Sequence, residues 1–282
     1  YDAWNLKVLL GLRYSESDLS FQKQTSHSGA PSPNPRESSS ANKWIPRVGV
    51  IWSANDTVDF FASYGESFNP QFNVQQGENG APLTDPETGQ QVEAGMRLYP
   101  FNGDLSVSLT AYELTKQNVV RSNPDVPNTS LLDGEQRSRG VELDIAGSLS
   151  DAIDLYLSYA YTDTEIVQGA NDADTGAQFT GIPKNKLVAW ADWEFWNGYS
   201  VAYGLDYQDD HNTDLAGAAV IDGRTLHELR LRKTYVLEGV DLNVELAARN
   251  LTDEVWYQNA TNPVFIKRGE PRSFFATLRA DF

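Results

Sequence analysis

Cysteine is absent from this chain of 282 residues, and basic residues are few, with 22 Lys and Arg against 39 Asp and Glu. Without cysteine there is no disulfide scaffold and no thiolate metal site. The net charge of -17 makes the chain a poor partner for the phosphate backbone of nucleic acid. Because no phosphate-binding loop and no Ser-His-Asp spacing occurs, we expect that the protein is not an enzyme.

Long apolar runs are also missing. No stretch reaches the roughly 18 consecutive apolar residues of a transmembrane helix. Strands that alternate apolar and polar residues would escape this test, because only every second side chain faces lipid. Aromatic residues are plentiful, with 7 Trp, 13 Tyr and 12 Phe. Such a supply suits the aromatic girdles that lie at the two surfaces of a membrane.

The last stretch of the chain, residues 272–282, alternates strictly. Its even-numbered positions from Phe274 to Phe282 are all apolar, and its odd-numbered positions are polar except for Phe275. Side chains of a strand point alternately to opposite faces, and about ten residues suffice for a tilted strand to cross a bilayer. We therefore predict a membrane-spanning closing strand. A closing strand of a soluble sandwich is the alternative for this segment alone.

About twelve segments of this kind follow one another along the chain, joined alternately by long and short connections. The long connections are expected at residues 16–42, 69–89, 117–135, 163–183, 208–223 and 253–271. The short turns are expected at residues 54–57, 100–104, 149–152, 196–198 and 236–240. Outer-membrane barrels have this pattern, with short periplasmic turns and long external loops. The sequence predicts an all-β, transmembrane, antiparallel up-and-down barrel with about twelve strands in this chain.

The predicted inward faces carry many charges. The charged positions opposite the apolar faces are Glu93, Arg97, Glu142, Asp144, Asp192, Glu194, Glu228, Arg230, Arg232, Glu245, Arg249, Arg279 and Asp281. A narrow barrel would have to pack these groups tightly, whereas a wide barrel hydrates them or covers them with a plug. The pattern therefore favours a wide barrel.

Seven stretches, in order along the chain, resemble motifs of TonB-dependent outer-membrane receptors for ferric siderophores. The most specific is RSRGVE at residues 137–142, which matches the family motif letter for letter. The others are similar to family motifs and read ASYGESFNP at 62–70, DPETGQQVEAG at 85–95, QNV at 117–119, AYTD at 160–163, NLTD at 250–253 with Tyr257, and GEPR at 269–272 leading into the last strand.

The resemblance implies a 22-strand barrel filled by an N-terminal plug domain, located in the outer membrane of a Gram-negative bacterium. It implies uptake of a ferric siderophore, powered through TonB, and the ferrichrome and ferrioxamine branch, which takes hydroxamates, is the most similar. Residues 1–282 then correspond to the C-terminal portion of the barrel, and we expect the plug, through which TonB would act, to be absent from this chain. The expected partners are the siderophore, TonB and membrane lipid, and no cofactor is expected.

Receptors of this kind hold their ligand with aromatic side chains near the external mouth. The candidate binding residues are Phe72, Trp256, Tyr257 and Phe265, all in predicted long loops. Each has an ordinary alternative as girdle or loop packing. The middle of the last loop, residues 259–262, has no aromatic residue where the family often places a contact.

Metal-binding patterns are weak in this sequence. His211 lies near Asp209, Asp210 and Asp214, a set that could bind a metal but more often occurs in a solvated loop. Residues 171–176 begin like a calcium loop, but no glutamate stands at the twelfth position. We expect no metal site. A passive diffusion porin remains the alternative function, because strand alternation does not separate a porin from a receptor.

Overall fold

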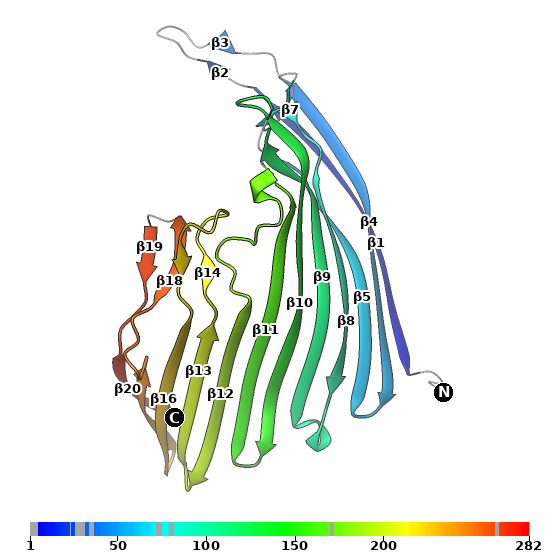
Figure 1. Ribbon diagram of the computed structural model, residues 1–282. Helices are drawn as coiled ribbons and strands as arrows, with labels where there is room; N and C mark the ends of the chain where they lie inside the picture. The colour runs from blue at the N-terminus through cyan, green and yellow to red at the C-terminus, as the bar shows by residue number, and fades with distance from the viewer. Residues whose placement is uncertain are drawn as a thin grey trace.

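The computed structural model describes residues 5–22, 24–25, 32–33, 37–71, 75–78, 82–123, 125–169, 172–262 and 265–281. Twelve strands form one antiparallel sheet in which neighbours in sequence are neighbours in space, from β1 at one edge to β20 at the other. The sheet curves into a wall (Figure 1). This is the predicted up-and-down arrangement of twelve strands.

The strands of the wall are long and regular. In order they are β1 (Leu6–Phe21), β4 (Glu37–Asn55), β5 (Val58–Asn69), β8 (Glu87–Leu98), β9 (Leu105–Ser122), β10 (Ser130–Ser150), β11 (Ile153–Gln168), β12 (Asn185–Trp196), β13 (Tyr199–Gln208), β16 (Arg224–Leu237), β17 (Val240–Arg249) and β20 (Ser273–Asp281). Two short 3-10 helices, η1 (Phe101–Gly103) and η2 (Asp172–Asp174), lie in connections. Among the described residues, no helix is long and apolar enough to span a membrane.

The five tight turns lie where the sequence predicts them, and all reach the lower end of the wall in Figure 1. In the turn between β12 and β13, Asn197 and Gly198 both have positive φ angles, as a two-residue hairpin turn requires. The six longer connections leave the opposite, upper end. The long and short connections are therefore separated, which fits the prediction of two different barrel ends.

The long connections are shorter than predicted, because several strands continue beyond the apolar part of the wall. β1 pairs with β4 from Leu6 to Phe21, so much of the predicted loop 16–42 is strand. β9 and β10 likewise enter the predicted loop 117–135 from both sides, and β11 continues to Gln168. These extensions carry polar residues on both faces, and side-chain contacts such as the ion pair of Arg121 with Asp133 add to the backbone ladder. Their lack of alternation is why the sequence pattern indicated loops.

Four connections contain small hairpins of their own. They are β2 (Gln24–Thr25) with β3 (Ser32–Pro33), β6 (Gln75–Gln76) with β7 (Pro82–Leu83), β14 (His211–Asn212) with β15 (Val220–Ile221), and β18 (Tyr257–Asn262) with β19 (Phe265–Arg268). The last two occupy the predicted loops 208–223 and 253–271. Both stand at the upper end, above the strands that form the site described below.

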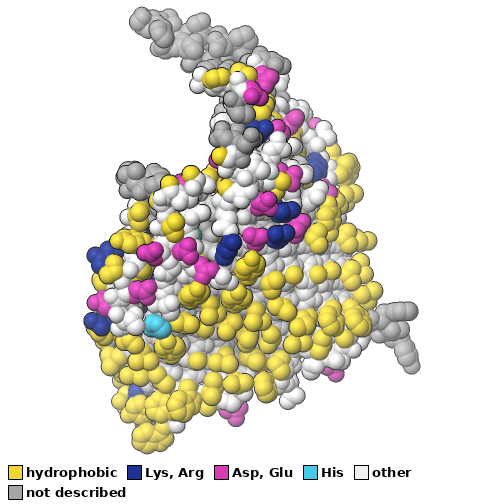
Figure 2. Space-filling view, in the orientation of Figure 1, with side chains coloured by type: hydrophobic (Ala, Val, Ile, Leu, Met, Phe, Trp, Pro, Cys, Tyr) yellow, Lys and Arg dark blue, Asp and Glu magenta, His cyan; other side chains and the backbone are white. Residues whose placement is uncertain are grey.

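The two faces of the wall differ as the alternation predicts. Apolar side chains form a broad belt over the lower part of the face shown in Figure 2, and charged side chains gather above the belt. Phe274 and Leu278, which share the apolar face of β20, are 72% and 70% exposed. No side chain among the described residues is both large and fully buried. Such a wall has no closed core, which argues against the soluble sandwich.

Candidate functional site

The strongest candidate site lies on the inner face of β12, β13, β16 and β17, beneath the connection from β17 to β20. These four strands are consecutive in the sheet, and their register brings Trp190, Gly204 and Glu228 into one row. The even-numbered residues of β12, β13 and β16 therefore share the polar, inward face. The site is built where this face meets the start of the last connection.

The connection begins with a turn that Asn250 holds together. Asn250 is buried and has a positive φ angle of 48°. Its side-chain amide donates to the carbonyl oxygens of Glu254 at 2.8 Å and Glu270 at 3.2 Å, and its side-chain oxygen accepts from the Glu254 N–H at 2.8 Å. The two ends of the connection are thereby tied together. This is the structural role of the NLTD stretch.

The same turn positions the indole of Trp256. Its ring N–H donates to the carbonyl oxygen of Glu270 at 3.1 Å, and its backbone carbonyl accepts from the Gly269 N–H at 2.9 Å. A Cβ atom at position 269 would lie 2.0 Å from the ring, so only glycine allows this approach. On the other side, the Arg224 guanidinium lies 4.0 Å from the ring centroid. Trp256 is therefore held between a glycine backbone and a cation.

Arg224 also forms an ion pair with Asp206, its Nη2 lying 3.2 Å from Oδ2 of the carboxylate. The other oxygen of Asp206 and the Nε of Arg224 are shielded from solvent but have no hydrogen-bond partner. A buried polar atom without a partner costs free energy, typically about 1–3 kcal/mol.

A second pair of a cation and an aromatic ring lies at the Trp190 end of the site. The Arg230 guanidinium lies 4.6 Å from the ring centroid of Trp190. The Glu228 carboxylate joins the cations of two strands, because its Oε1 lies 2.8 Å from the Nε of Arg230 and 3.6 Å from the Nε of Arg249. These contacts confirm that the three charges share the inward face, as the alternation predicts.

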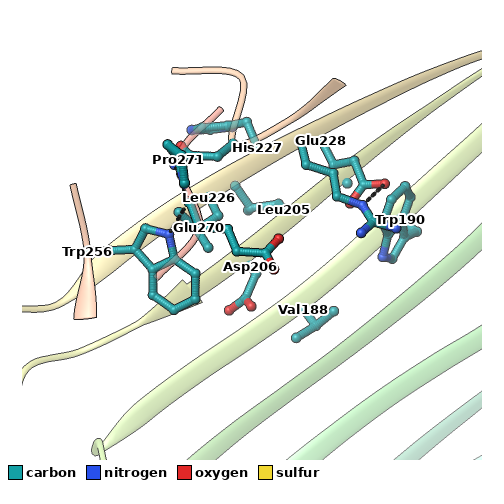
Figure 3. A pocket seen from close by; sticks show the side chains of 13 residues that line it. Val188, Trp190, Leu205, Asp206, Leu226, His227, Glu228, Trp256, Glu270 and Pro271 are labelled. Carbon is teal, nitrogen blue, oxygen red and sulfur yellow. Dashed lines mark hydrogen bonds and ion pairs between the residues drawn. The ribbon is translucent and has the colours of Figure 1, made fainter. Parts of the chain in front are cut away.

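Between these groups lies a pocket of about 240 Å³. Its lining combines two indoles, aliphatic groups and both signs of charge, from Val188, Trp190, Asp206, Leu226, Glu228, Arg249, Trp256, Glu270 and Pro271 among others. Figure 3 shows Trp256 and Trp190 at opposite ends of the pocket, with Asp206 between them. Apolar walls with a few converging polar groups are typical of small-molecule sites.

Of the four predicted binding residues, Trp256 lines this pocket. Tyr257 begins β18, is 42% exposed and pairs with Arg268, so it belongs to the hairpin above the pocket. Phe265 begins β19, but its side chain lies outside the described residues, as does all of Phe72. The structure thus brings one of the four to the pocket and places a second beside it.

The other polar groups of the pocket were not singled out from the sequence. Trp190, Asp206 and Arg249 occupy polar-face positions of predicted strands. A tryptophan on an otherwise polar face is the signal that could have indicated Trp190. No sequence pattern pointed to Arg224, which begins β16, or to Glu270, because their contacts with Trp256 depend on how the last connection folds back.

The residues around His211 have other roles. Asp209 accepts from the backbone and side-chain amides of Asn185 and from the Tyr207 hydroxyl. The hydrogen bond from Tyr207, followed by those from Asn185, lowers the pKa of Asp209. Asp214 accepts from the N–H groups of Ala218 and Ala219. His211 itself is only 5% exposed, and burial lowers its pKa.

Metal binding has no support in the part of the chain that the structure describes, where no group of three or more His, Asp or Glu side chains gathers in a way that could hold a metal ion. The stretch that resembles a calcium loop begins at Asn171, which lies outside the described residues, and continues as η2.

Comparison with known proteins gives the family. The profile of the family described as "TonB dependent receptor-like, beta-barrel" matches residues 1–251. The metal-pseudopaline receptor CntO of Pseudomonas aeruginosa is 29% identical over 84% of this chain and 33% of its own length. The ferrichrome outer membrane transporter/phage receptor of Escherichia coli is 29% identical over 84% of this chain and 32% of its own. The ferrioxamine B receptor of Salmonella typhimurium is 25% identical over 99% of this chain and 38% of its own.

The chain thus spans about a third of the length of the curated relatives it matches. Solved structures agree in fold. The siderophore receptor PiuA of Acinetobacter baumannii superposes with a TM-score of 0.83 at 21% identity, over 97% of this chain and 40% of that one. The ferric preacinetobactin receptor BauA of the same species gives 0.82 at 21% identity, over 99% and 40%. The chain belongs to the TonB-dependent receptor β-barrel family, and its wall is that of an outer-membrane barrel.

Proposed function

We propose that the whole protein is an outer-membrane receptor that takes up a ferric siderophore with energy supplied through TonB. In this proposal residues 1–282 form the C-terminal part of a 22-strand barrel, and a plug domain elsewhere in the protein contacts TonB. The inward pocket beneath the β17–β20 connection forms part of the path of the chelate. The curated relatives named above are transport receptors and support this reading.

The observation that carries the proposal is the chemistry of this pocket. A ferric chelate presents apolar edges and hydrogen-bonding oxygens together, so it is best matched by aromatic rings beside polar groups. The pocket has Trp256 and Trp190 at its ends, and Asp206, one of whose carboxylate oxygens has no hydrogen-bond partner, lies between them. Such a surface suits a ligand that makes polar and apolar contacts at the same time.

We further propose that the chelate is of the hydroxamate type. The support is the similarity to the ferrichrome transporter and the ferrioxamine B receptor, to which the chain is 29% and 25% identical. The proposed contacts are Phe72, Trp256, Tyr257 and Phe265, together with Trp190 from the wall. Tyr257 and Phe265 would act from the β18–β19 hairpin at the upper end.

A passive porin fits these observations less well. A porin needs a hydrated opening, but it does not need an indole fixed between Gly269 and Arg224. The relatives and structures named above are receptors and transporters of chelates. The fixed indole of Trp256 and the named relatives both favour the gated receptor.

Binding of ferric ferrichrome and ferrioxamine B to the full-length receptor tests the proposal. Replacing Trp256 by alanine removes one amphipathic contact, and we expect a loss of about 1–3 kcal/mol, roughly 5-fold to 150-fold in Kd. Isothermal titration in detergent solution gives the affinities directly. Phe265→Ala is the second variant, since its side chain would come from the hairpin above.

Leu246→Val is the matched control, because Leu246 is 55% exposed on the apolar outer face and lies away from the pocket. Its affinity should equal that of the parent. The receptor reading fails if neither ferric hydroxamate binds at micromolar concentration. The porin reading then gains support if the purified protein conducts ions steadily in a planar bilayer.

A further inference from the structure

Lys233 is a cation on the apolar outer face of the wall. The odd-numbered residues of β16 include Leu229 and Leu231, and the register pairs Lys233 with Tyr199 of β13 and Val244 of β17. Its Nζ lies 4.3 Å from the ring centroid of Tyr199 and 5.2 Å from that of Tyr235. It also donates to the backbone carbonyl oxygen of Asn197 in the turn between β12 and β13.

Among the described residues, no carboxylate forms an ion pair with this cation. Arg232, next to Lys233 in sequence but on the inward face, pairs with Asp192. Aromatic faces and a carbonyl oxygen hold an ammonium group in place but leave its full charge. Lys233 is therefore oriented and still able to bind an anion.

The surface around Lys233 is hollowed and combines apolar with polar groups. A hollow of about 550 Å³ extends from the β12–β13 turn along the end of β16 and is lined by Asn197, Gly198, Lys233, Tyr235, Val236 and Leu237 among others. Val236 is 81% exposed and Leu237 55%. Nearby, Trp196 stacks on Tyr199 with 5.7 Å between ring centroids. The carboxylate in the lining, Glu194, accepts from the Gly198 N–H at 3.2 Å.

The position of Lys233 along the wall points to the membrane surface. Trp and Tyr side chains of barrels concentrate where lipid meets water, and Tyr199, Tyr235 and Trp196 mark that level here. None of the five turn sequences at this end contains Lys or Arg. On the outward positions of β12, β13, β16, β17 and β20, Lys233 is the one Lys or Arg among the described residues. At this level the charged groups of a bilayer are lipid phosphates.

We propose that Lys233, Tyr199 and Tyr235 form a binding site for the phosphate of one glycerophospholipid in the leaflet that meets the turns. The ammonium group binds the phosphodiester, and the tyrosine hydroxyl groups face the same polar layer. Leu237 and Trp196 contact the upper part of an acyl chain. All these residues come from strands that are consecutive in the sheet, so the site is complete within this chain.

Native mass spectrometry of the full-length receptor tests this site. The receptor is delipidated in detergent and then exposed either to dioleoylphosphatidylglycerol or to dioleoylglycerol, which has the same acyl chains without the phosphate. We expect the parent to retain one phosphatidylglycerol and little dioleoylglycerol. Lys233→Gln should lower this retention about fivefold, the effect expected of one lysine at a lipid surface. Lys233→Arg keeps the charge and should restore retention.

Lys267→Gln is the control, because Lys267 lies in the β19 hairpin at the opposite end of the wall and should leave retention unchanged. Electrophoresis without heating verifies that each variant stays folded. The proposal is overturned if folded Lys233→Gln retains phosphatidylglycerol as well as the parent does. It is equally overturned if the parent retains dioleoylglycerol as strongly as phosphatidylglycerol, since the phosphate would then contribute nothing.

Discussion

Gly269 has no side chain, and this determines where the indole of Trp256 lies. The indole of Trp256 occupies the space that a Cβ at position 269 would take, at 2.0 Å from the ring. It is held there by its hydrogen bond to the Glu270 carbonyl and by the Arg224 cation. The shape of the pocket at this end therefore depends on one glycine, which belongs to the GEPR stretch of the sequence.

Gly269→Ala should displace Trp256 and loosen the end of the last connection. Overpacking of this kind typically costs about 1–3 kcal/mol, so exchange of the backbone amides of residues 265–272 should be roughly 5 to 100 times faster. Hydrogen exchange followed by mass spectrometry of the receptor measures this rate. In a Trp256→Ala background the clash is gone, and Gly269→Ala should have little further effect.

Gly49→Ala is the matched control for this prediction. Gly49 lies in β4 of the wall, and a Cβ there would meet Leu9 at 3.7 Å, an ordinary contact distance. Exchange should therefore remain that of the parent. If Gly269→Ala also exchanges like the parent, the indole does not depend on this glycine.

Single strands show what could be predicted from sequence and what could not. In β12, lipid on one side and water on the other require alternation, so its register and its outward Leu187, Trp193 and Phe195 were predictable. Beyond the apolar belt both faces of a strand meet water, so apolar and polar residues no longer need to alternate. The upper parts of β1 and β10 therefore show no alternation from which a strand could be predicted. Trp256 was predicted as a loop aromatic, but its neighbours Arg224 and Glu270 depend on how the connection folds back, which no local pattern contains.

The connection from β17 to β20 depends on the Asn250 turn. Asn250→Ala would remove its three side-chain hydrogen bonds and place at this positive φ angle a residue that tolerates it less well than asparagine. Asn250→Gly would remove the hydrogen bonds alone, because glycine adopts this φ freely. We expect trypsin to cut after Lys267 or Arg268 faster in both variants, and fastest in Asn250→Ala, where about 1 kcal/mol of backbone strain is added.

Cleavage after Lys184, in the β11–β12 connection, serves as the internal reference for this experiment. The Asn250 side chain bonds to Glu254 and Glu270 and not to that connection. Its rate should not change. Equal cleavage after Lys267 in the parent and both variants would show that the hairpin is held by other contacts.

At the scale of the whole molecule, the wall has two unlike faces and two unlike ends. The outer face carries the apolar belt, and Lys233 is the one Lys or Arg at the described outward positions of β12, β13, β16, β17 and β20. The inner face carries ion pairs such as Glu228 with Arg230. One end has only tight turns, and the other has the connections and hairpins that stand over the pocket. An outer-membrane barrel with short periplasmic turns would therefore open its pocket toward the outside of the cell.

This orientation predicts which residues are accessible on intact cells. The chain has no cysteine, so a single introduced thiol can be labelled selectively in it. Ala216→Cys lies in the β13–β16 connection and Glu238→Cys in the turn between β16 and β17, and both positions are exposed. A membrane-impermeant maleimide should label Ala216→Cys in intact cells that express the full-length receptor, and Glu238→Cys only after lysis.

The parent receptor gives the background, and Asp151→Cys in another turn should behave like Glu238→Cys. Labelling of Glu238→Cys in intact cells at the rate of Ala216→Cys would reverse the orientation, and with it the assignment of the pocket to the external mouth and of Lys233 to the inner leaflet.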